Sequence, residues 1–327
     1  MNDLKTFEIK KYKRENYNLW NNFVANAKNA TFLFHRDFME YHSDRFGDFS
    51  LLVFDEKQNL KAILPANRVE DVVYSHQGLT YGGLVLEAKS KLIETLLIFR
   101  SILKYLNENE IKVFELKQVP TIYYDFPSDE MEYACFLLDA QLKRRDTLSV
   151  IDLQSSFKIS STRKQEINKT EGLVVKEVFE FETFWNQILV PNLAEKHQAK
   201  PVHSLAEIVA LQSKFPKNIK QFNVYYNNEI IAGTTIFESK NVVHSQYISG
   251  KKEWNHLGGL DFLHHHLITK EFKEKHFFDF GISNENQGKN INQGLLFWKE
   301  SFGARTIVQN FYSIETKNFN KLETILL

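Results

Sequence analysis

Residues 276–303, which read HFFDFGISNENQGKNINQGLLFWKESFG, constrain the fold more than any other stretch of this chain. A short apolar run ends near Asp279, and a polar loop punctuated by glycine follows over residues 283–290. An amphipathic segment then covers residues 291–302 and stops at Gly303. This order predicts a strand, a long loop and a helix. Because loops at the ends of strands often carry binding and catalytic residues, we expect a site here.

Regular elements surround this stretch in the second half of the chain. Apolar runs bounded by short polar turns predict strands over residues 219–226, 230–238 and 242–249. A helix fits residues 259–275, and a last strand fits residues 305–314. The second half therefore combines an antiparallel meander with a helix, a strand, a helix and a strand, which is an α/β arrangement with a mixed sheet.

The first half has a similar but looser order of elements, without a residue-level repeat. Strands are predicted over residues 49–55 and 60–67, and a third apolar patch over residues 69–74 leads into a loop marked by Gly78, Gly82 and Gly83. The clearest helix of the chain covers residues 89–109, and a strand over residues 111–117 follows it. Five apolar residues lie in a single stripe of that helix. They are Leu92, Leu96, Phe99, Leu103 and Leu106.

The length of the chain also favours two domains. A chain of 327 residues exceeds one ordinary domain and fits two of about 150 residues each. A serine-rich stretch over residues 154–161 separates the two similar halves. We therefore predict α/β domains with mixed sheets over residues 1–155 and 156–327, with a cleft between them.

Charge, cysteine and histidine content exclude several classes of function. The formal net charge is +0, so no basic field indicates nucleic acid, and we expect no DNA partner. The single cysteine, Cys135, forbids an intrachain disulfide and a cysteine-based zinc site, which favours a reducing, cytoplasmic setting. Three consecutive histidines, residues 264–266, would point about 100° apart on a helix and cannot converge on one ion. We therefore expect no metal site.

The sequence also gives no indication of a membrane segment. The N-terminus reads MNDLKTFEIKKYKREN and lacks the apolar core of a signal peptide. No window approaches the roughly 18 uninterrupted apolar residues that a membrane-spanning helix needs. We therefore expect a soluble cytoplasmic protein that does not insert into a membrane.

The order of elements in the second half resembles the acetyltransferase fold of the GNAT superfamily. Two such halves in one chain resemble the FemAB-like, or Fem-type, tandem-domain transferases. The motif-level similarity lies in Asp279-Phe280-Gly281, Ser283, Glu285, Gly288, Asn292, Gly294, Trp298-Lys299-Glu300 and Phe302-Gly303. Further similarities lie in the basic helix over residues 163–172, in Ala232-Gly233 of a strand hairpin and in Tyr81-Gly82-Gly83. The resemblance covers most of the chain.

The resemblance implies an acyltransferase that is similar to N-acetyltransferases. Such an enzyme would move an acyl group from acyl-CoA to an amine or hydroxyl of a cell-envelope or polysaccharide precursor. Fem-type cell-wall enzymes instead use aminoacyl-tRNA and a peptidoglycan precursor, and they often carry a long helical hairpin in the second domain. This chain has no heptad-rich insertion, so tRNA is the alternative donor. A third reading is a catalytically silent binding module that keeps the fold.

In a GNAT-like fold, two elements are expected to hold the donor. Its pantetheine arm can pair with a strand edge at Gln246-Tyr247-Ile248, where backbone N–H groups near Tyr247 can also stabilise an oxyanion. Its pyrophosphate can bind the N–H groups that begin the next helix, at Leu257-Gly258-Gly259. The superfamily usually has Arg or Gln, two residues, Gly, one residue, and Gly or Ala here. The segment from Asn255 lacks the basic residue and the spacing. A glycine-containing helix start without phosphate is the alternative.

Transfer also needs a group that removes the proton of the acceptor. Asp279, Glu285 and His244 are the candidates. Asp279 ends a buried strand, where desolvation would raise the pKa of its carboxyl; alternatively, it caps the loop by accepting the N–H groups of Ile282 and Ser283. Glu285 in the polar loop can equally be solvated, and His244 can be a hydrogen-bonded histidine of the sheet.

Lys299 is the fourth candidate for a catalytic role. The helix over residues 291–302 is expected to bury the stripe Ile291, Leu295, Trp298 and Phe302, with Lys299 about 100° from Trp298 at its edge. From there, Lys299 can extend to solvent or reach the cleft to bind a phosphate or carboxylate. Asn290 and Gln293 are expected to cap the helix, which leaves Asn292 for the substrate. The other expected substrate contacts are Tyr81, Ser283 and Trp298.

Overall fold

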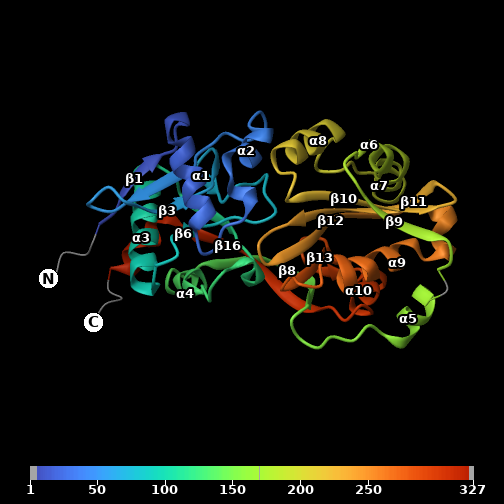
Figure 1. Ribbon diagram of the computed structural model, residues 1–327. Helices are drawn as coiled ribbons and strands as arrows, with labels where there is room; N and C mark the ends of the chain where they lie inside the picture. Colours follow the sequence, from blue (N-terminus) through green and yellow to red (C-terminus); the bar gives the residue numbers. More distant parts are fainter. Residues whose placement is uncertain (1–5, 169, 324–327) are drawn as a thin grey trace. The chain divides into compact units, whose positions relative to one another are not determined.

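The computed structural model describes residues 6–168 and 170–323 (Figure 1). The chain divides into two compact units, Met1–Asp146 with Val308–Leu327, and Thr147–Ile307. The C-terminal segment belongs to the first unit, whereas the order of elements along the sequence places it with the second domain. The change from the first unit to the second falls before the serine-rich stretch, within strand β8 (Gln141–Asp152).

The first unit contains two groups of strands. The antiparallel sheet β1-β2-β3-β6 consists of Glu8–Lys11, Leu51–Phe54, Leu60–Leu64 and Val85–Leu86. The strands β4-β5-β7-β16 consist of Asn67–Val69, Val72–Tyr74, Val113–Lys117 and Arg305–Glu315. In this second group only β5 and β7 run parallel. The α-helices α1 to α4 are Tyr17–Asn26, Arg36–Met39, Leu92–Glu108 and Glu130–Leu137. The shorter 3-10 turns are Arg14–Asn16, Phe32–Phe34, Glu40–His42, Thr121–Tyr123 and Thr316–Leu322.

Helix α3 is the crossover between the parallel strands β5 and β7. Four of its five stripe residues are buried, and Leu92 is exposed at the first turn. The buried stripe shares one core with Phe114 and Leu116 of β7. Glu115 and Lys117 alternate with these two residues along β7, so their side chains lie on the opposite face of the strand.

The loop that follows β5 folds back on its own chain at Gly82. A Cβ atom at Gly82 would lie 1.8 Å from the carbonyl oxygen of Ser75, so only glycine fits. The next residue, Gly83, has φ +116°, which also favours glycine. The glycines of this loop, which the sequence marks as a place of sharp turning or close approach, are therefore explained by contacts within the chain.

The second unit is built on one sheet with helices on both faces. Its strand order is β8-β13-β12-β11-β10-β9, and β9 to β13 are Leu173–Val178, Ile219–Tyr226, Glu229–Glu238, Val242–Gly250 and Phe277–Ile282. Only β12 and β13 pair in parallel. A small hairpin is formed by β14 (Asn284–Glu285) and β15 (Asn290–Ile291).

Figure 1 shows α6, α7 and α8 over one face of this sheet and α9 and α10 over the other. The α-helices α5 to α10 are Ser161–Asn168, Glu182–Phe184, Val190–His197, Leu205–Lys214, Gly259–His266 and Gln293–Glu300. A 3-10 turn and two π-helical segments adjoin them, Lys252–Leu257, Trp185–Leu189 and Leu267–Glu271. The core under α9 joins Leu263 and Leu267 to Phe222 and Phe278 of the sheet. The meander, the crossover helix and the strand–loop–helix order of residues 276–303 thus agree with the sequence-based prediction.

Candidate functional site

The two parallel strands of the second unit separate at one point. The register of β12 with β13 runs from Val242 with Phe277 to His244 with Asp279. Strand β12 continues to Gly250. In the described part of the chain, no strand pairs with β12 on this side beyond His244. The edge of β12 at the predicted donor segment Gln246-Tyr247-Ile248 therefore has no strand beside it.

The same segment carries a β-bulge. Ser245 is paired with Ile236 of β11, and Tyr247 is paired with the preceding residue, Thr235. Within these two described strands, Gln246 is the extra residue of the bulge. A bulge bends the strand and re-aims its backbone groups, and bulges are frequent beside active sites.

His244 and Asp279 form a hydrogen-bonded pair where the strands separate. The His244 Nδ1 atom lies 2.9 Å from Asp279 Oδ2, and Asp279 is buried. The other carboxylate oxygen of Asp279 accepts the N–H of Gly281 at 2.7 Å. Because an ionised carboxylate only accepts, Nδ1 of His244 donates, and the lone pair of a neutral ring lies on Nε2. The carboxylate of Asp279 thus caps the start of the loop at Gly281, while the predicted contacts with the N–H groups of Ile282 and Ser283 stay a prediction.

A pocket of about 520 Å³ opens beside the separated strands. It is lined by Leu189, Asn192, Leu193, Ile248, Ser249, Ile282, Ser283, Asn284, Glu285, Asn292 and Leu295. Four residues predicted from the sequence, Ile248, Ser283, Glu285 and Asn292, are brought together here. Among these described lining residues Glu285 has the only ionisable side chain, so the pocket wall carries negative charge.

Polar groups in this pocket are arranged around the start of α10. Asn292 is the N-cap of the helix, because its Oδ1 atom accepts the N–H of Leu295 at 3.0 Å. The prediction that Asn290 and Gln293 cap the helix is therefore wrong. Asn292 also donates to Glu285 Oε1 at 3.1 Å. The hydroxyl oxygen of buried Ser283 has no hydrogen-bond partner in the described part of the protein.

Asn192 of α7 lines the pocket, although no prediction from the sequence included it. Its Nδ2 atom donates to Ser249 Oγ at 2.7 Å and to Gly250 O at 2.8 Å. These bonds fix the end of β12, which forms one wall of the pocket. No local pattern in the sequence marks this asparagine, because its role depends on a strand about 57 residues away.

Lys299 is buried and does not line the pocket. Its ammonium donates to the carbonyl oxygens of Gly281 at 3.0 Å and Ile282 at 2.6 Å. Burial lowers the pKa of Lys299 to about 8, and the carboxylate of Asp279 acts in the opposite direction. Lys299 therefore holds the end of β13, which forms the opposite wall of the pocket.

The environment of α10 differs from the expected amphipathic stripe. Ile291 and Leu295 are exposed, Trp298 is half-buried, and only Phe302 of the expected stripe is buried. Phe297 is 71% exposed. The helix thus buries a lysine and leaves apolar side chains at the surface, because its inner face meets the carbonyl oxygens at the end of β13.

A smaller cavity of about 210 Å³ lies at the N-terminus of α9. Gly258, Gly259 and Trp298 line it, together with Arg163 of α5 and Asp261 of α9. Asp261 forms an ion pair with Arg163 and accepts the indole N–H of Trp298 at 2.7 Å. An arginine therefore lies near the helix start, although the local sequence lacks a basic residue there. The carboxylate of Asp261 already neutralises part of the positive potential at this end of the helix.

Each glycine in this loop also has a structural reason. Gly258 has φ +65°, in the left-handed region. A Cβ atom at Gly259 would lie 3.0 Å from Ile231 Cδ1, so glycine lets α9 pack on β11. Leu257 is half-buried and packs against the core beneath the loop. The glycines by themselves therefore do not indicate a bound phosphate.

The two tyrosines of the predicted site point into the protein. The buried Tyr247 side chain contacts Trp185, with ring centroids 5.1 Å apart, and its hydroxyl lies 2.7 Å from His203 Nδ1. Only the backbone of Tyr247 remains available for the predicted oxyanion contact. Tyr81 belongs to the first unit, where it is buried and donates to Thr31 Oγ1 at 3.0 Å.

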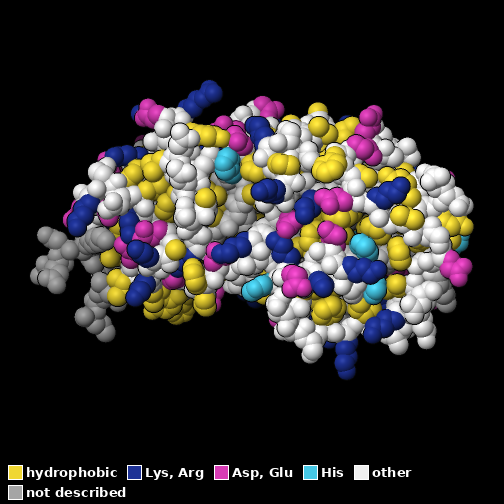
Figure 2. All heavy atoms as spheres, in the orientation of Figure 1, with side chains coloured by type: hydrophobic (Ala, Val, Ile, Leu, Met, Phe, Trp, Pro, Cys, Tyr) yellow, Lys and Arg dark blue, Asp and Glu magenta, His cyan; other side chains and the backbone are white. Residues whose placement is uncertain are grey.

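No cluster of three or more His, Cys, Asp or Glu side chains suited to a metal ion occurs in residues 6–168 and 170–323. No helix in these ranges is long and apolar enough to cross a membrane. Figure 2 shows acidic and basic side chains interspersed over the visible face, in agreement with the balanced composition.

Comparison with known proteins gives matches in structure only. No protein-family model and no curated protein matches the sequence. The structure of FemX matches with a TM-score of 0.67 at 9% identity, over 97% of this chain and 99% of that chain. L-PGS from Bacillus licheniformis matches with a TM-score of 0.55 at 11% identity, over 94% and 93%. A tandem GNAT protein from the clavulanic acid biosynthesis pathway matches with 0.52 at 11% identity, over 95% and 98%.

These matches define the fold of the chain. It is an α/β protein with the Fem-like tandem GNAT fold, which confirms the fold expected from the order of elements. At such low identity, the similarity concerns the fold and not the reaction.

Proposed function

We propose that the protein is an acyltransferase whose reaction takes place where β12 and β13 separate. One observation carries the proposal. The strands part just beyond the His244–Asp279 pair, and a pocket of about 520 Å³ opens between their ends. An extended donor can add to the bulged edge of β12 as a further strand, which brings its carbonyl close to backbone N–H groups.

The acceptor that suits this pocket is an amine. Glu285 is the only ionisable side chain among the described residues that line it, and the hydroxyl of Ser283 adds an oxygen without a hydrogen-bond partner in the described part of the protein. These groups favour a ligand that donates hydrogen bonds or carries positive charge. The neutral amine would attack the donor carbonyl, its proton would pass to Nε2 of His244, and the thiolate of the donor would leave.

Acyl-CoA is the proposed donor, with its pyrophosphate at the N-terminus of α9. The uncapped start of this helix and Arg163 favour an anion there, whereas Asp261 opposes it. The acceptor is proposed to be a precursor of the cell envelope or of a polysaccharide, in the cytoplasm. This proposal rests on the fold that the chain shares with FemX and L-PGS.

Acetyl-CoA at 1 mM is expected to raise the Tm of the protein. If its Kd is about 10 μM, the gain in free energy of unfolding is ~2.7 kcal/mol, or on the order of 5 °C for a unit of this size. Differential scanning fluorimetry measures the shift, with ATP at the same concentration as a control for unspecific polyphosphate binding.

The absence of a shift with acetyl-CoA would contradict the CoA donor. Asp261, which takes up part of the charge of Arg163, is the observation that favours a different donor. In that case, salt-dependent binding of aminoacyl-tRNA would support the Fem-type alternative. Binding of neither donor would favour a silent binding module.

Replacing Glu285 with glutamine is expected to raise KM for the acceptor amine ~10-fold and to leave kcat nearly unchanged. The reason is the loss of one charge-assisted contact that is made equally in the ground state and the transition state. Thiol release from acetyl-CoA with a panel of primary amines provides the assay. Glu300→Gln, on the exposed side of α10, is the matched control. An unchanged KM in Glu285→Gln would remove Glu285 from the acceptor site.

A further inference from the structure

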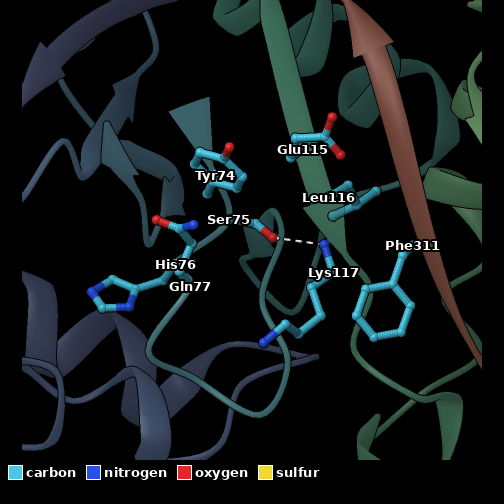
Figure 3. A pocket seen from close by; sticks show the side chains of 8 residues that line it. All are labelled: Tyr74, Ser75, His76, Gln77, Glu115, Leu116, Lys117 and Phe311. Atoms are coloured by element: carbon cyan, nitrogen blue, oxygen red, sulfur yellow. Dashed lines mark hydrogen bonds between the residues drawn. The ribbon is translucent and has the colours of Figure 1, made fainter. Parts of the chain in front are cut away.

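A further cavity, of about 160 Å³, lies in the first unit, at the carboxyl end of the parallel pair β5 and β7. The register of β5 with β7 ends at Tyr74 with Glu115; β5 stops there, whereas β7 continues to Lys117. Figure 3 shows the side chains of Tyr74, Glu115 and Lys117 along this cavity, with Phe311 of β16 at one side and the imidazole of His76 pointing away from β7.

The position of this cavity matches a general rule for ligand sites. In α/β sheets, ligands bind outside the carboxyl ends of strands where the pairing separates. The larger pocket of the second unit lies at such a place, after His244 and Asp279. The pair β5 and β7, joined through α3, has the same parallel arrangement in the first unit. The cavity beside it is thus a candidate site in its own right.

Two oppositely charged side chains belong to the lining of this cavity. Glu115 and Lys117 are two residues apart on β7, so they lie on one face with Cα atoms ~7 Å apart. Neither forms an ion pair within residues 6–168 and 170–323, although both are half-buried. The Lys117 ammonium donates to Leu79 O at 2.6 Å, which leaves two of its three hydrogens for other acceptors.

The loop side of the cavity also holds an unsatisfied polar group. His76 is 4% exposed, has φ +69°, and its Nδ1 atom has no hydrogen-bond partner among the described residues. Burial lowers the pKa of His76 to about 3 and that of Lys117 to about 8. An unpaired buried polar group costs free energy in the folded protein.

We propose that this cavity binds a small zwitterion of the amino-acid type. Its carboxylate would bind the Lys117 ammonium, its ammonium would bind the Glu115 carboxylate, and its side chain would lie against Phe311. The cavity has room for about five water molecules, which is the size of a small amino acid. A purely anionic ligand would leave Glu115 unpaired, and a purely cationic one would leave Lys117 unpaired.

The test is isothermal titration calorimetry of the full chain with glycine, L-alanine and L-serine. Propionate and ethylamine are the matched probes, because each lacks one charged group of L-alanine. At least one amino acid is expected to bind ~10-fold or more tightly than propionate and ethylamine. Lys117→Met and Glu115→Gln are each expected to weaken this binding by at least that factor. Lys112→Met, at an exposed lysine just before the same strand, is the control.

The proposal fails if none of the three amino acids binds, or if propionate binds as tightly as L-alanine. It also fails if binding survives both Lys117→Met and Glu115→Gln. Glu285→Gln, in the other unit, should leave the binding unchanged. Loss of binding in Glu285→Gln but not in Lys117→Met would assign the amino acid to the pocket of the second unit. The proposed acyl transfer can therefore fail or hold independently of this site.

Discussion

Replacing His244 with alanine is expected to lower kcat ~10²- to 10⁴-fold, the range that general-base catalysis contributes. Nε2 of His244 is the candidate base, and the buried carboxylate of Asp279 orients the ring. Thiol release from acetyl-CoA, with an amine acceptor found by screening, measures the effect. His276→Ala is a matched control, because it removes another imidazole beside β13 and leaves the His244–Asp279 pair intact.

Chemical rescue separates a base from a structural histidine. Added imidazole is expected to restore part of the activity of His244→Ala, because it can occupy the space of the missing ring and accept the proton. It should not restore Asp279→Asn, in which the ring is present but no longer held by a carboxylate. Full activity in His244→Ala without imidazole would exclude His244 as the base and leave Glu285 as the candidate.

Several features of the fold could be predicted because they depend on local periodicity. The apolar stripe of α3 and the order of strand, loop and helix in residues 276–303 are both visible in the pattern of neighbouring residues along the sequence. The same holds for the meander of the second unit. Membership of β16 in the first unit could not be predicted in this way. Its partner β7 lies almost 200 residues earlier, and no local pattern encodes that pairing.

The pairing of His244 with Asp279 was equally hidden from the sequence. Each residue was a candidate by its chemistry, but their contact depends on the parallel register of β12 and β13. The separation of β12 from β13 beyond this pair also depends on the register of the two strands. In the sequence, the polar residues of β12 do not differ from those of an ordinary strand. The sequence could therefore name the candidate residues, while their combination required the tertiary structure.

Lys299 shows a further limit of periodicity. Spacing on a helix tells which residues share a face but not which face is covered. Apolar residues predicted an inward stripe, yet Leu295 and Phe297 are exposed and Lys299 is buried. The carbonyl oxygens of Gly281 and Ile282 need donors in a buried place, and Lys299 supplies them.

The stability of the protein is expected to rise with pH between about 8 and 10.5 because of Lys299. Burial lowers the pKa of Lys299 from its ordinary value of 10.5 to about 8. Over this range the unfolded chain binds the proton and the folded protein does not, so the free energy of unfolding increases with pH. The difference amounts to ~3 kcal/mol. A neutral amine still has two hydrogens for the two carbonyl oxygens, so deprotonation keeps the contacts.

Lys299→Met is expected to lose this rise, because methionine does not titrate. Urea unfolding of the wild type and the variant at several pH values between 7 and 10.5 measures the difference between the two curves. Other lysines and the tyrosines titrate in both proteins and cancel. Lys289→Met, at an exposed position of the loop before α10, should keep the full rise. Parallel curves for wild type and Lys299→Met would mean that Lys299 remains charged in the fold, bound to its two carbonyl oxygens as an ammonium throughout this range. A positioning role for Lys299 would then rest on charge as well as on hydrogen bonds.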